Sequence, residues 1–283
     1  MALDAHELDE RQRELWRRAA EGWERRQKSF REKTASVSRW LVDAIDPQPG
    51  ERVLEIAAGP GETGFIAAQR LGPRGRLLCT DQAPEMLEVA RRRAAELGLE
   101  NVDFAVLDAQ RMELEAGSFD AALCRWGYML MGEPDEAMRR TRLALRDGGR
   151  LALATWDRPD RNMWMAAPVM TMVAQGVLPP PNPADPSPFA LHDVDDLERR
   201  LRGAGFASVR TERLEFAQWF PSLDEYWAEA IDMAAPLAEA VSGLPPDGVE
   251  AVRAGTQELL SQFVATDGRI EVPASAVVAL AAT

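Results

Sequence analysis

The turn that joins an apolar run to three glycines constrains the fold of this chain more than any other segment. Residues 53–58 are mostly apolar, and Gly59, Gly61 and Gly64 follow them in the pattern G-x-G-x-x-G. Glycines at this spacing allow a tight turn and let backbone amides approach a ligand at the N-terminus of the next helix. The segment therefore predicts a strand, a turn and a helix that together bind a nucleotide-type cofactor.

Acidic residues in three apolar runs indicate the kind of cofactor. Glu55 lies in the first run, where its carboxylate would repel a pyrophosphate but favour the sulfonium and ammonium groups of S-adenosylmethionine. Asp81 ends the second run, 20 residues after Gly61, where an acid accepts ribose hydroxyls in doubly wound folds. Asp108 ends the third run and is placed to accept a hydrogen bond from an adenine amino group. A nicotinamide-dependent dehydrogenase remains the alternative on the glycine pattern alone, and Glu55 and Asp108 disfavour it.

These residues lie in a stretch that resembles the class I S-adenosylmethionine-dependent methyltransferases. Within that family it is similar to the small-molecule group called methyltransferase type 11, which includes the enzymes of ubiquinone and menaquinone biosynthesis. The resemblance extends from about residue 40 to residue 156 and rests on RVLEIAAGPGETG, GRLLCTDQAPEMLEVARRRA, NVDFAVLDAQRMELEAGSFDAALCRWGYMLM and LALRDGGRLALATW. It implies S-adenosylmethionine as cofactor, S-adenosylhomocysteine as product and no metal.

The motifs of the resemblance define a predicted cofactor site. One position departs from the family pattern: Ala57 stands where glycine is usual, and its methyl group narrows the approach of the backbone to the methionine part of the cofactor. The predicted cofactor-binding residues are Glu55, Ala57, Gly59, Gly61, Asp81, Gln82, Met86, Asp108, Ala109 and Arg125.

Apolar runs alternate with helical patterns along the chain, which is typical of a parallel sheet with helices on both faces. We expect an α/β fold, a doubly wound, mainly parallel, Rossmann-like sheet of seven strands with helical cap insertions. The final strand, near 269–280, is expected to run antiparallel and to close an edge of the sheet. Expected strands before it include 77–81, 102–107, 119–125, 150–155 and 207–216, and expected helices include 64–71, 84–97, 135–145 and 194–203.

The whole chain, 1–283, is predicted to be a single methyltransferase domain. Residues 47–157 would form the cofactor-binding core. Residues 1–46 would form two helices, 8–30 and 36–45, of which the first is either a lid over the cofactor or simply packs on the domain. Segments 158–190 and 222–264 would be insertions that cap the substrate, the second with two helical stretches.

The cap segments and the N-terminal helices are rich in methionine and tryptophan, which favours an apolar or aromatic small-molecule acceptor. Candidate substrate-binding residues are Trp23, Tyr128, Trp164 and Trp227. The alternative for each is ordinary core packing, since large apolar side chains are usually buried.

Methyl transfer is an in-line displacement at an activated carbon, so alignment of the reactants supplies much of the catalysis. A base helps when the acceptor is a hydroxyl group. His192 and Asp157 are the candidate catalytic residues, His192 because imidazole titrates near neutral pH and Asp157 because it follows the fifth strand. Alternatively, His192 is a surface residue that caps the helix beginning near Asp193.

Composition narrows the partners and the location. The formal net charge is −13, and such an acidic surface repels nucleic acid and anionic lipid. Two cysteines and two histidines show no metal-ligand spacing, and a disulfide is not expected. No leader and no apolar stretch long enough to span a bilayer is recognisable, so we expect no membrane contact, a cytoplasmic location, and a monomer or homodimer.

The expected function is S-adenosylmethionine-dependent methylation of oxygen or carbon on a quinone-like, aromatic or other secondary-metabolite acceptor, with nitrogen also possible. Fold and cofactor site do not fix the chemistry. The alternatives are therefore a non-methylating enzyme, such as a cyclase, and a non-catalytic protein that binds S-adenosylmethionine.

Overall fold

The centre of the computed structural model, which describes residues 5–182 and 185–283, is one seven-stranded sheet. The strand order is β3-β2-β1-β4-β5-β7-β6, and β7 alone runs antiparallel to its neighbours. The predicted doubly wound, mainly parallel α/β fold is confirmed. The strands are β1 (Arg52–Ile56), β2 (Arg76–Asp81), β3 (Val102–Val106), β4 (Phe119–Arg125), β5 (Leu145–Trp156), β6 (Ser208–Phe220) and β7 (Ile270–Ala282).

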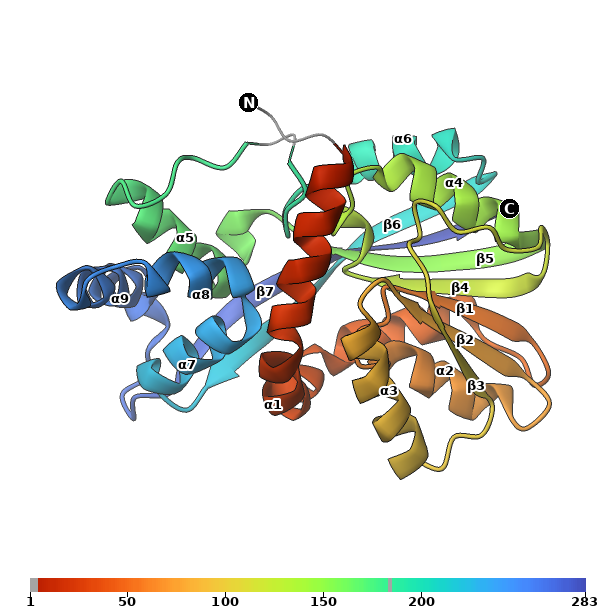
Figure 1. Cartoon of the computed structure of the whole chain (residues 1–283), viewed down its shortest axis with the longest axis horizontal. Coiled ribbons are helices and arrows are strands. Elements are labelled where there is room, and N and C mark those ends of the chain that lie inside the picture. The colour runs from red at the N-terminus through yellow and green to blue at the C-terminus, as the bar shows by residue number, and fades with distance from the viewer. Residues whose placement is uncertain (1–4, 183–184) are drawn as a thin grey trace.

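Helices cover both faces of the sheet (Figure 1). On one side α1 packs with α2 and α3, and on the other α4 packs with α6. A further group lies beyond the end of the sheet, around the long strands β6 and β7 (Figure 1). The helices are α1 (Ala5–Ile45), α2 (Glu62–Leu71), α3 (Pro84–Glu96), α4 (Pro134–Ala144), α5 (Met163–Ala174), α6 (Val194–Gly203), α7 (Leu223–Met233), α8 (Ala235–Ser242) and α9 (Pro246–Leu260).

The order of the strands reverses between β1 and β4. From β1 the chain builds β2 and β3 toward one edge, and it then crosses back to place β4 on the other side of β1. The helices after β1 and β4 therefore diverge, and a crevice opens beyond the carboxyl ends of these two strands. Glu55 and Arg125 lie at those ends, which places them at the crevice.

The last strand differs from the prediction. β7 is antiparallel as expected, but it lies between β5 and β6 and not at the edge. Its residues are buried along most of its length, and its sequence, IEVPASAVVALAA, is a nearly continuous apolar run. Such a run is typical of a strand covered on both faces, whereas β6 carries the alternating charged residues of an edge strand.

The N-terminal segment also differs from the prediction, because one helix of 41 residues, α1, replaces the two expected helices. Residues 31–35 contain neither proline nor glycine, so nothing in the sequence breaks the helix there. Phe30, Lys33 and Thr34 in this stretch are buried. Packing against the body of the protein therefore keeps the helix continuous through the expected break.

The two segments expected to cap the substrate are both partly helical. Segment 158–190 contains α5, and segment 222–264 contains three helices, α7, α8 and α9, where two were expected. The extra boundary falls at Ala234, just before Pro236 at the start of α8. Met172 of α5, Leu237 of α8 and Val252 of α9 form one buried cluster, so the two segments pack as a unit.

Among residues 5–182 and 185–283, no group of three or more histidine, cysteine, aspartate or glutamate side chains is placed to hold a metal ion. None of the helices in these ranges is both long and apolar enough to cross a membrane. Cys79 in β2 and Cys124 in β4 are free thiols buried in the sheet.

Candidate active site

The glycine turn after β1 has a backbone that few residues other than glycine adopt. Gly59 and Gly61 have positive φ angles of 54° and 77°. Beside Gly59 there is open space, since an added Cβ would meet no atom within 4 Å. Gly61 faces the ring of Phe65 and begins α2. The turn therefore leaves room for a ligand next to the backbone at Gly59.

Ala57, the residue that departs from the family pattern, also has a positive φ, of 50°. This left-handed conformation explains why glycine is usual at this position, because a Cβ is strained there. Trp126, just after β4, is left-handed as well, with a φ of 59°. The two strained residues follow the two strands that flank the crevice, and such strain is often found at functional sites.

Glu55 is a buried carboxylate at the centre of the site. Its Oε1 accepts a hydrogen bond of 2.7 Å from the amide of Gly64, in the first turn of α2, while its Oε2 is buried without a hydrogen-bond partner among the described residues. Burial raises the pKa of Glu55 to about 7. A cationic group placed beside Oε2 would compensate this buried carboxylate, which is the charge that S-adenosylmethionine carries in its amino-acid part.

Asp81 and Asp108 organise the loops that follow β2 and β3. The two oxygens of Asp81 each accept an amide hydrogen bond of 2.9 Å, one from Gly59 and one from Ala83. Burial raises the pKa of Asp81 in spite of these bonds. Asp108 accepts hydrogen bonds from the amide of Gln110, at 2.9 Å, and from Arg111. Both residues line the cavity described next, and a carboxylate can accept more hydrogen bonds than these.

A cavity of about 510 Å³ lies at the carboxyl ends of the strands. It brings together all the predicted cofactor residues except Gly61, and it also includes Trp23 and Trp164 of the predicted substrate residues. The site therefore fits the expected cofactor at three places: open space beside Gly59, the unpartnered Oε2 of Glu55 and the carboxylate of Asp81.

Arg125 reaches the cavity but its charge is already balanced. It forms an ion pair of 3.0 Å with Glu62 of α2 and donates to the hydroxyls of Ser38 and Thr34 in α1. These contacts join the end of β4 to two helices. Arg125 therefore fixes α1 against the site, a role that its position at a strand end did not predict.

A continuous row of aromatic rings lines the part of the cavity that we call its acceptor half, and the first ring, Trp23, packs against Met86 of the predicted cofactor residues. Successive ring centroids are 4.9, 5.4, 4.2 and 5.3 Å apart along the row, and Trp126 and Trp156 are stacked. The row runs from α1 across the ends of β4 and β5 to α5, in the order Trp23, Phe30, Trp126, Trp156 and Trp164. We call these five residues the aromatic wall.

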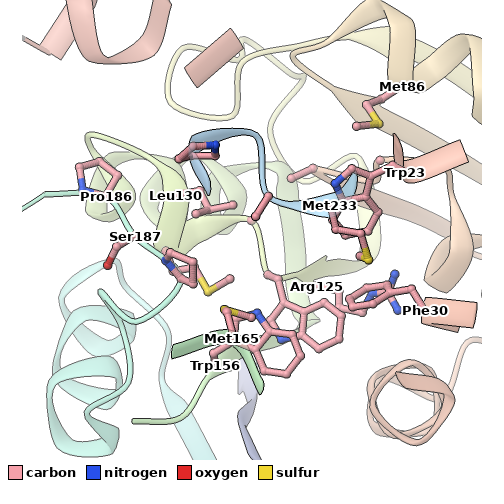
Figure 2. Close-up of a pocket in the computed structure, with 18 of the residues that line it drawn as sticks. Trp23, Phe30, Met86, Arg125, Leu130, Trp156, Met165, Pro186, Ser187 and Met233 are labelled. Carbon is pink, nitrogen blue, oxygen red and sulfur yellow. The ribbon is translucent and has the colours of Figure 1, made fainter. Parts of the chain in front are cut away.

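Flexible side chains complete this half of the cavity. Figure 2 shows Met165 beside Trp156 and Met233 beside Trp23, while Pro186 and Ser187 lie across the space from them. The sequence analysis identified Trp23 and Trp164 but missed Phe30, Trp126 and Trp156. Trp156 is the last residue of β5, as Asp81 is the last residue of β2. A search for residues at the carboxyl ends of parallel strands, which led to Asp81, would therefore have found Trp156 as well.

Two of the predicted substrate residues lie outside the cavity. Tyr128 is buried beneath it, and its hydroxyl forms a 2.7 Å hydrogen bond with Thr141 of α4. Trp227 lies on the side of α7 that packs against the cluster of Met172, Leu237 and Val252. Residues 226 and 230 of the same helix lie one turn apart, and both line the cavity. Residue 227 follows residue 226 directly, so its side chain points to a different side of the helix, away from the cavity.

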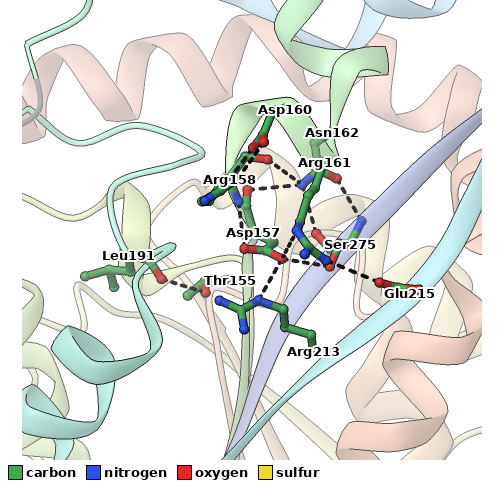
Figure 3. A network of polar contacts seen from close by, with 10 residues as sticks. All are labelled: Thr155, Asp157, Arg158, Asp160, Arg161, Asn162, Leu191, Arg213, Glu215 and Ser275. Atoms are coloured by element: carbon green, nitrogen blue, oxygen red, sulfur yellow. Dashed lines mark hydrogen bonds and ion pairs between the residues drawn. The ribbon is translucent and has the colours of Figure 1, made fainter.

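The two predicted catalytic residues also lie outside the cavity. The ring Nδ1 of His192 is 2.7 Å from the carbonyl oxygen of Phe189, within its own loop. Asp157 is fully buried and accepts hydrogen bonds from Ser275, Arg213 and the amide of Arg158 (Figure 3). Neither His192 nor Asp157 is among the residues that line the cavity, so a catalytic role for either one stays a prediction.

The network around Asp157 has a structural function. Asn162 donates hydrogen bonds to the carbonyl oxygens of Asp157 and Ser275, at 3.0 and 2.9 Å (Figure 3). Asp157 and Asn162 thus fasten the start of segment 158–190 to β7. They fix the direction in which that segment leaves the sheet.

Replacement of Asp157 by alanine is expected to lower stability and to leave cofactor binding unchanged. It removes the partner of the buried Ser275 hydroxyl and of Arg213, and such losses cost about 2 to 4 kcal/mol. Chemical denaturation and titration with S-adenosylhomocysteine would measure the two effects. Asp160→Ala, which removes an exposed ion pair with Arg158 in the same loop, is the control and should change neither. A stable Asp157→Ala protein without turnover would restore Asp157 as a catalytic candidate.

The pKa of Glu55 predicts that cofactor affinity depends on pH. In the free protein this carboxyl keeps its proton up to pH of about 7, and a cationic ligand favours the ionised form, so binding expels the proton. S-Adenosylmethionine is expected to bind about tenfold more weakly at pH of about 5.5 than at about 8. Titration calorimetry across this window checks it, with Glu55→Gln as the control that loses the dependence. An equal dependence of affinity on pH in the native protein and in Glu55→Gln would contradict the assignment of Glu55 to the cofactor site.

Comparison with known proteins identifies relatives over most of the chain. A family model described as a methyltransferase domain matches residues 47–180. Aklanonic acid methyltransferase DauC of Streptomyces sp. (strain C5) is 32% identical over 182 residues, which are 62% of this chain and 83% of DauC. Nocamycin O-methyltransferase of Saccharothrix syringae is 30% identical over 217 residues, 73% of this chain and 72% of the relative.

Solved structures show the same fold at low sequence identity. The YcgJ protein of Bacillus subtilis superposes with a TM-score of 0.60 at 15% identity, over 88% of this chain and 98% of YcgJ. The shared fold thus extends beyond residues 47–180, the segment that the family model matches.

Proposed function

Because this chain belongs to the class I S-adenosylmethionine-dependent methyltransferases, we propose that it methylates oxygen or carbon of a small, largely apolar aromatic acceptor. The observation that carries the proposal is one cavity that is lined both by the predicted cofactor residues, except Gly61, and by the aromatic wall. The names of two relatives, which refer to aklanonic acid and to O-methylation of nocamycin, support a small organic acceptor and, for the second, an oxygen atom as the site of methylation.

S-Adenosylmethionine supplies a methyl carbon that its sulfonium centre activates. The residues of the chain bind and align the reactants. Asp81 would accept the ribose hydroxyls, Asp108 would bind the adenine, and Glu55 would compensate the positive charge of the amino-acid part. These three residues would hold the cofactor in one orientation, and alignment of the reactants supplies much of the rate in a displacement reaction.

The aromatic wall favours a flat acceptor. Its rings present apolar surface and stack well on other aromatic systems. Met165 and Met233 adapt to the outline of the bound molecule. The net charge of −13 argues against a nucleic acid as acceptor.

We propose that the caps of the cavity correspond to the segments expected from the sequence, residues 1–46, 158–190 and 222–264, around a core of residues 47–157. Each of these cap segments contributes lining residues, Trp23 and Phe30 from the first, Trp164 from the second and Met233 from the third. Closure by three separate segments would exclude water from the reacting atoms.

The test is a direct assay of methyl transfer. The protein is incubated with S-adenosylmethionine and a panel of hydroxylated naphthoquinones and anthraquinones, and mass spectrometry quantifies both the products and S-adenosylhomocysteine. Equal amounts of methylated product and S-adenosylhomocysteine are expected. Product that lacks a new methyl group would favour a cyclase-like activity, and cofactor binding without turnover of any acceptor would favour a binding protein.

A further inference from the structure

A buried ion pair lies at the wall of the acceptor half of the cavity. The side-chain ammonium of Lys33 in α1 is 2.7 and 2.8 Å from the two carboxylate oxygens of Glu229 in α7. Both residues are buried, and Lys33 also lies over the ring of Phe220, 3.9 Å from its centroid. Glu229 lines the cavity, whereas Lys33 lies behind it.

Glu229 is distinct among the charged groups of the cavity. The described charged residues of the lining are Glu55, Asp81, Asp108, Arg125 and Glu229, and the first four lie at the ends of β1 to β4. Glu229 comes from the cap helix α7 and shares its surroundings with the aromatic residues Phe220 and Tyr226. It is therefore a polar group within apolar surroundings, where an acceptor and not the cofactor would meet it.

The hydrogen bonds of Glu229 leave one accepting position open. A carboxylate has about four lone-pair positions, two on each oxygen. Lys33 occupies one on each oxygen, and the hydroxyl of Ser29 donates to Oε2 at 3.1 Å. One position on Oε1 remains open among the described residues. Since Lys33 already balances the charge, the complementary ligand group is a neutral donor such as a hydroxyl, and not a cation.

The ion pair is not needed to join the two helices. Arg25 and Arg26 of α1 bind Asp232 of α7 at 2.8 and 2.7 Å, one turn away along α7. Gly22 of α1 lies so close to the backbone of α7 that an added Cβ would be 2.0 Å from the carbonyl oxygen of Asp232. The helices therefore have a separate contact outside the cavity, which makes a purely structural role for Glu229 redundant.

We propose that Glu229, held by Lys33 and Ser29, binds a neutral hydroxyl group of the acceptor and thereby selects phenols or enols over hydrocarbon analogues. This inference rests on the proposed function, because it assigns the acceptor to the same cavity. It makes Glu229 a specificity-determining residue, and the hydroxyl group it holds positions the aromatic ring against the aromatic wall.

The test compares 2-naphthol with naphthalene by equilibrium dialysis in the presence of saturating S-adenosylhomocysteine. The native protein is expected to bind 2-naphthol about tenfold more tightly, which is the fold-change that one hydrogen bond to a charged acceptor supports. In the double variant Lys33→Met/Glu229→Leu, the ratio is expected to fall to about two. This double replacement removes both charges together, so no unpaired charge is left buried.

Two further variants separate recognition from stability. Asp232→Ala removes the ion pairs of Arg25 and Arg26 with Asp232, a residue of α7 that does not line the cavity, and it should keep the native preference for 2-naphthol. Glu229→Gln keeps the size of the side chain while removing its charge, and it should give an intermediate ratio even if the double variant does not fold. A ratio unchanged in Glu229→Gln, or equally reduced in Asp232→Ala, would overturn the inference. A different result would count against the proposed function itself. If the native protein binds S-adenosylhomocysteine normally but binds neither 2-naphthol nor naphthalene, the cavity does not take an apolar aromatic acceptor, and this inference fails with the proposed function.

Discussion

Replacement of Gly64 by alanine is expected to destabilise the protein and to weaken cofactor binding, although alanine is ordinarily the better helix former. An added Cβ at this position would be 2.1 Å from Oε2 of Glu55 and 2.9 Å from a methyl carbon of Leu77. Glu55 is buried, and moving it aside would break its hydrogen bond to the amide of Gly64. The displaced carboxylate would be buried without that bond, at a cost of about 3 kcal/mol.

Gly203 provides a matched control for this substitution. It is also a helical glycine, at the end of α6, and an added Cβ there would meet no atom within 4 Å. Gly203→Ala should therefore leave stability unchanged or raise it by up to about 1 kcal/mol. Urea denaturation of the two variants measures the difference. Equal stability of Gly64→Ala and Gly203→Ala would show that Glu55 is free to relocate, contrary to the close packing described above.

Asp81→Ala is expected to reduce the affinity for S-adenosylmethionine at least about a hundredfold, or about 2.7 kcal/mol. Two effects add. The variant loses the carboxylate that is placed to accept the ribose hydroxyls, and it also frees the amides of Gly59 and Ala83, which Asp81 holds at 2.9 Å. Without its hydrogen bond to Asp81, Gly59 no longer holds the glycine turn in the conformation that binds the ligand. Titration calorimetry with S-adenosylmethionine and S-adenosylhomocysteine measures the change.

Asp120 supplies the control for Asp81. It also accepts a backbone amide hydrogen bond, from Arg52 at 2.8 Å. However, it lies near the start of β4, and the cavity lies at the other end of the strand. Asp120→Ala should therefore keep native cofactor affinity. Micromolar binding that survives in Asp81→Ala would remove this carboxylate from the cofactor site, and the position of the ribose would have to be assigned elsewhere in the cavity.

Several features of the site followed from local patterns. The acids Glu55, Asp81 and Asp108 were found because each lies at or near the end of an apolar run, and parallel strands bring such ends to one edge of the sheet. The glycines of the turn were found because positive φ angles require them. Both arguments use only spacing along the chain and the geometry of single elements.

Other features could not be read from local patterns. Trp126 and Trp156 become neighbours only because β4 and β5 pair in parallel, with Trp126 donating its backbone amide to Ala154. Lys33 and Glu229 are 196 residues apart in the sequence. From the sequence alone, each would be predicted to be an exposed charged residue on a helix. Asp157 and Trp227 illustrate the converse, because neither lines the cavity, and residue type and nearby strand ends do not show which way a side chain points.

By itself, the sequence determined the doubly wound fold and the cofactor class, and it predicted the residues at the cofactor. These features depend on the alternation of apolar runs and helical patterns and on the glycine turn, which are patterns over short distances along the chain. The tertiary structure decided which residues form the acceptor half of the cavity, the place of β7 inside the sheet and the continuity of α1. Those features depend on packing between segments that are distant in the sequence, and an apolar or charged residue on a helix carries no local mark of the partner it will meet.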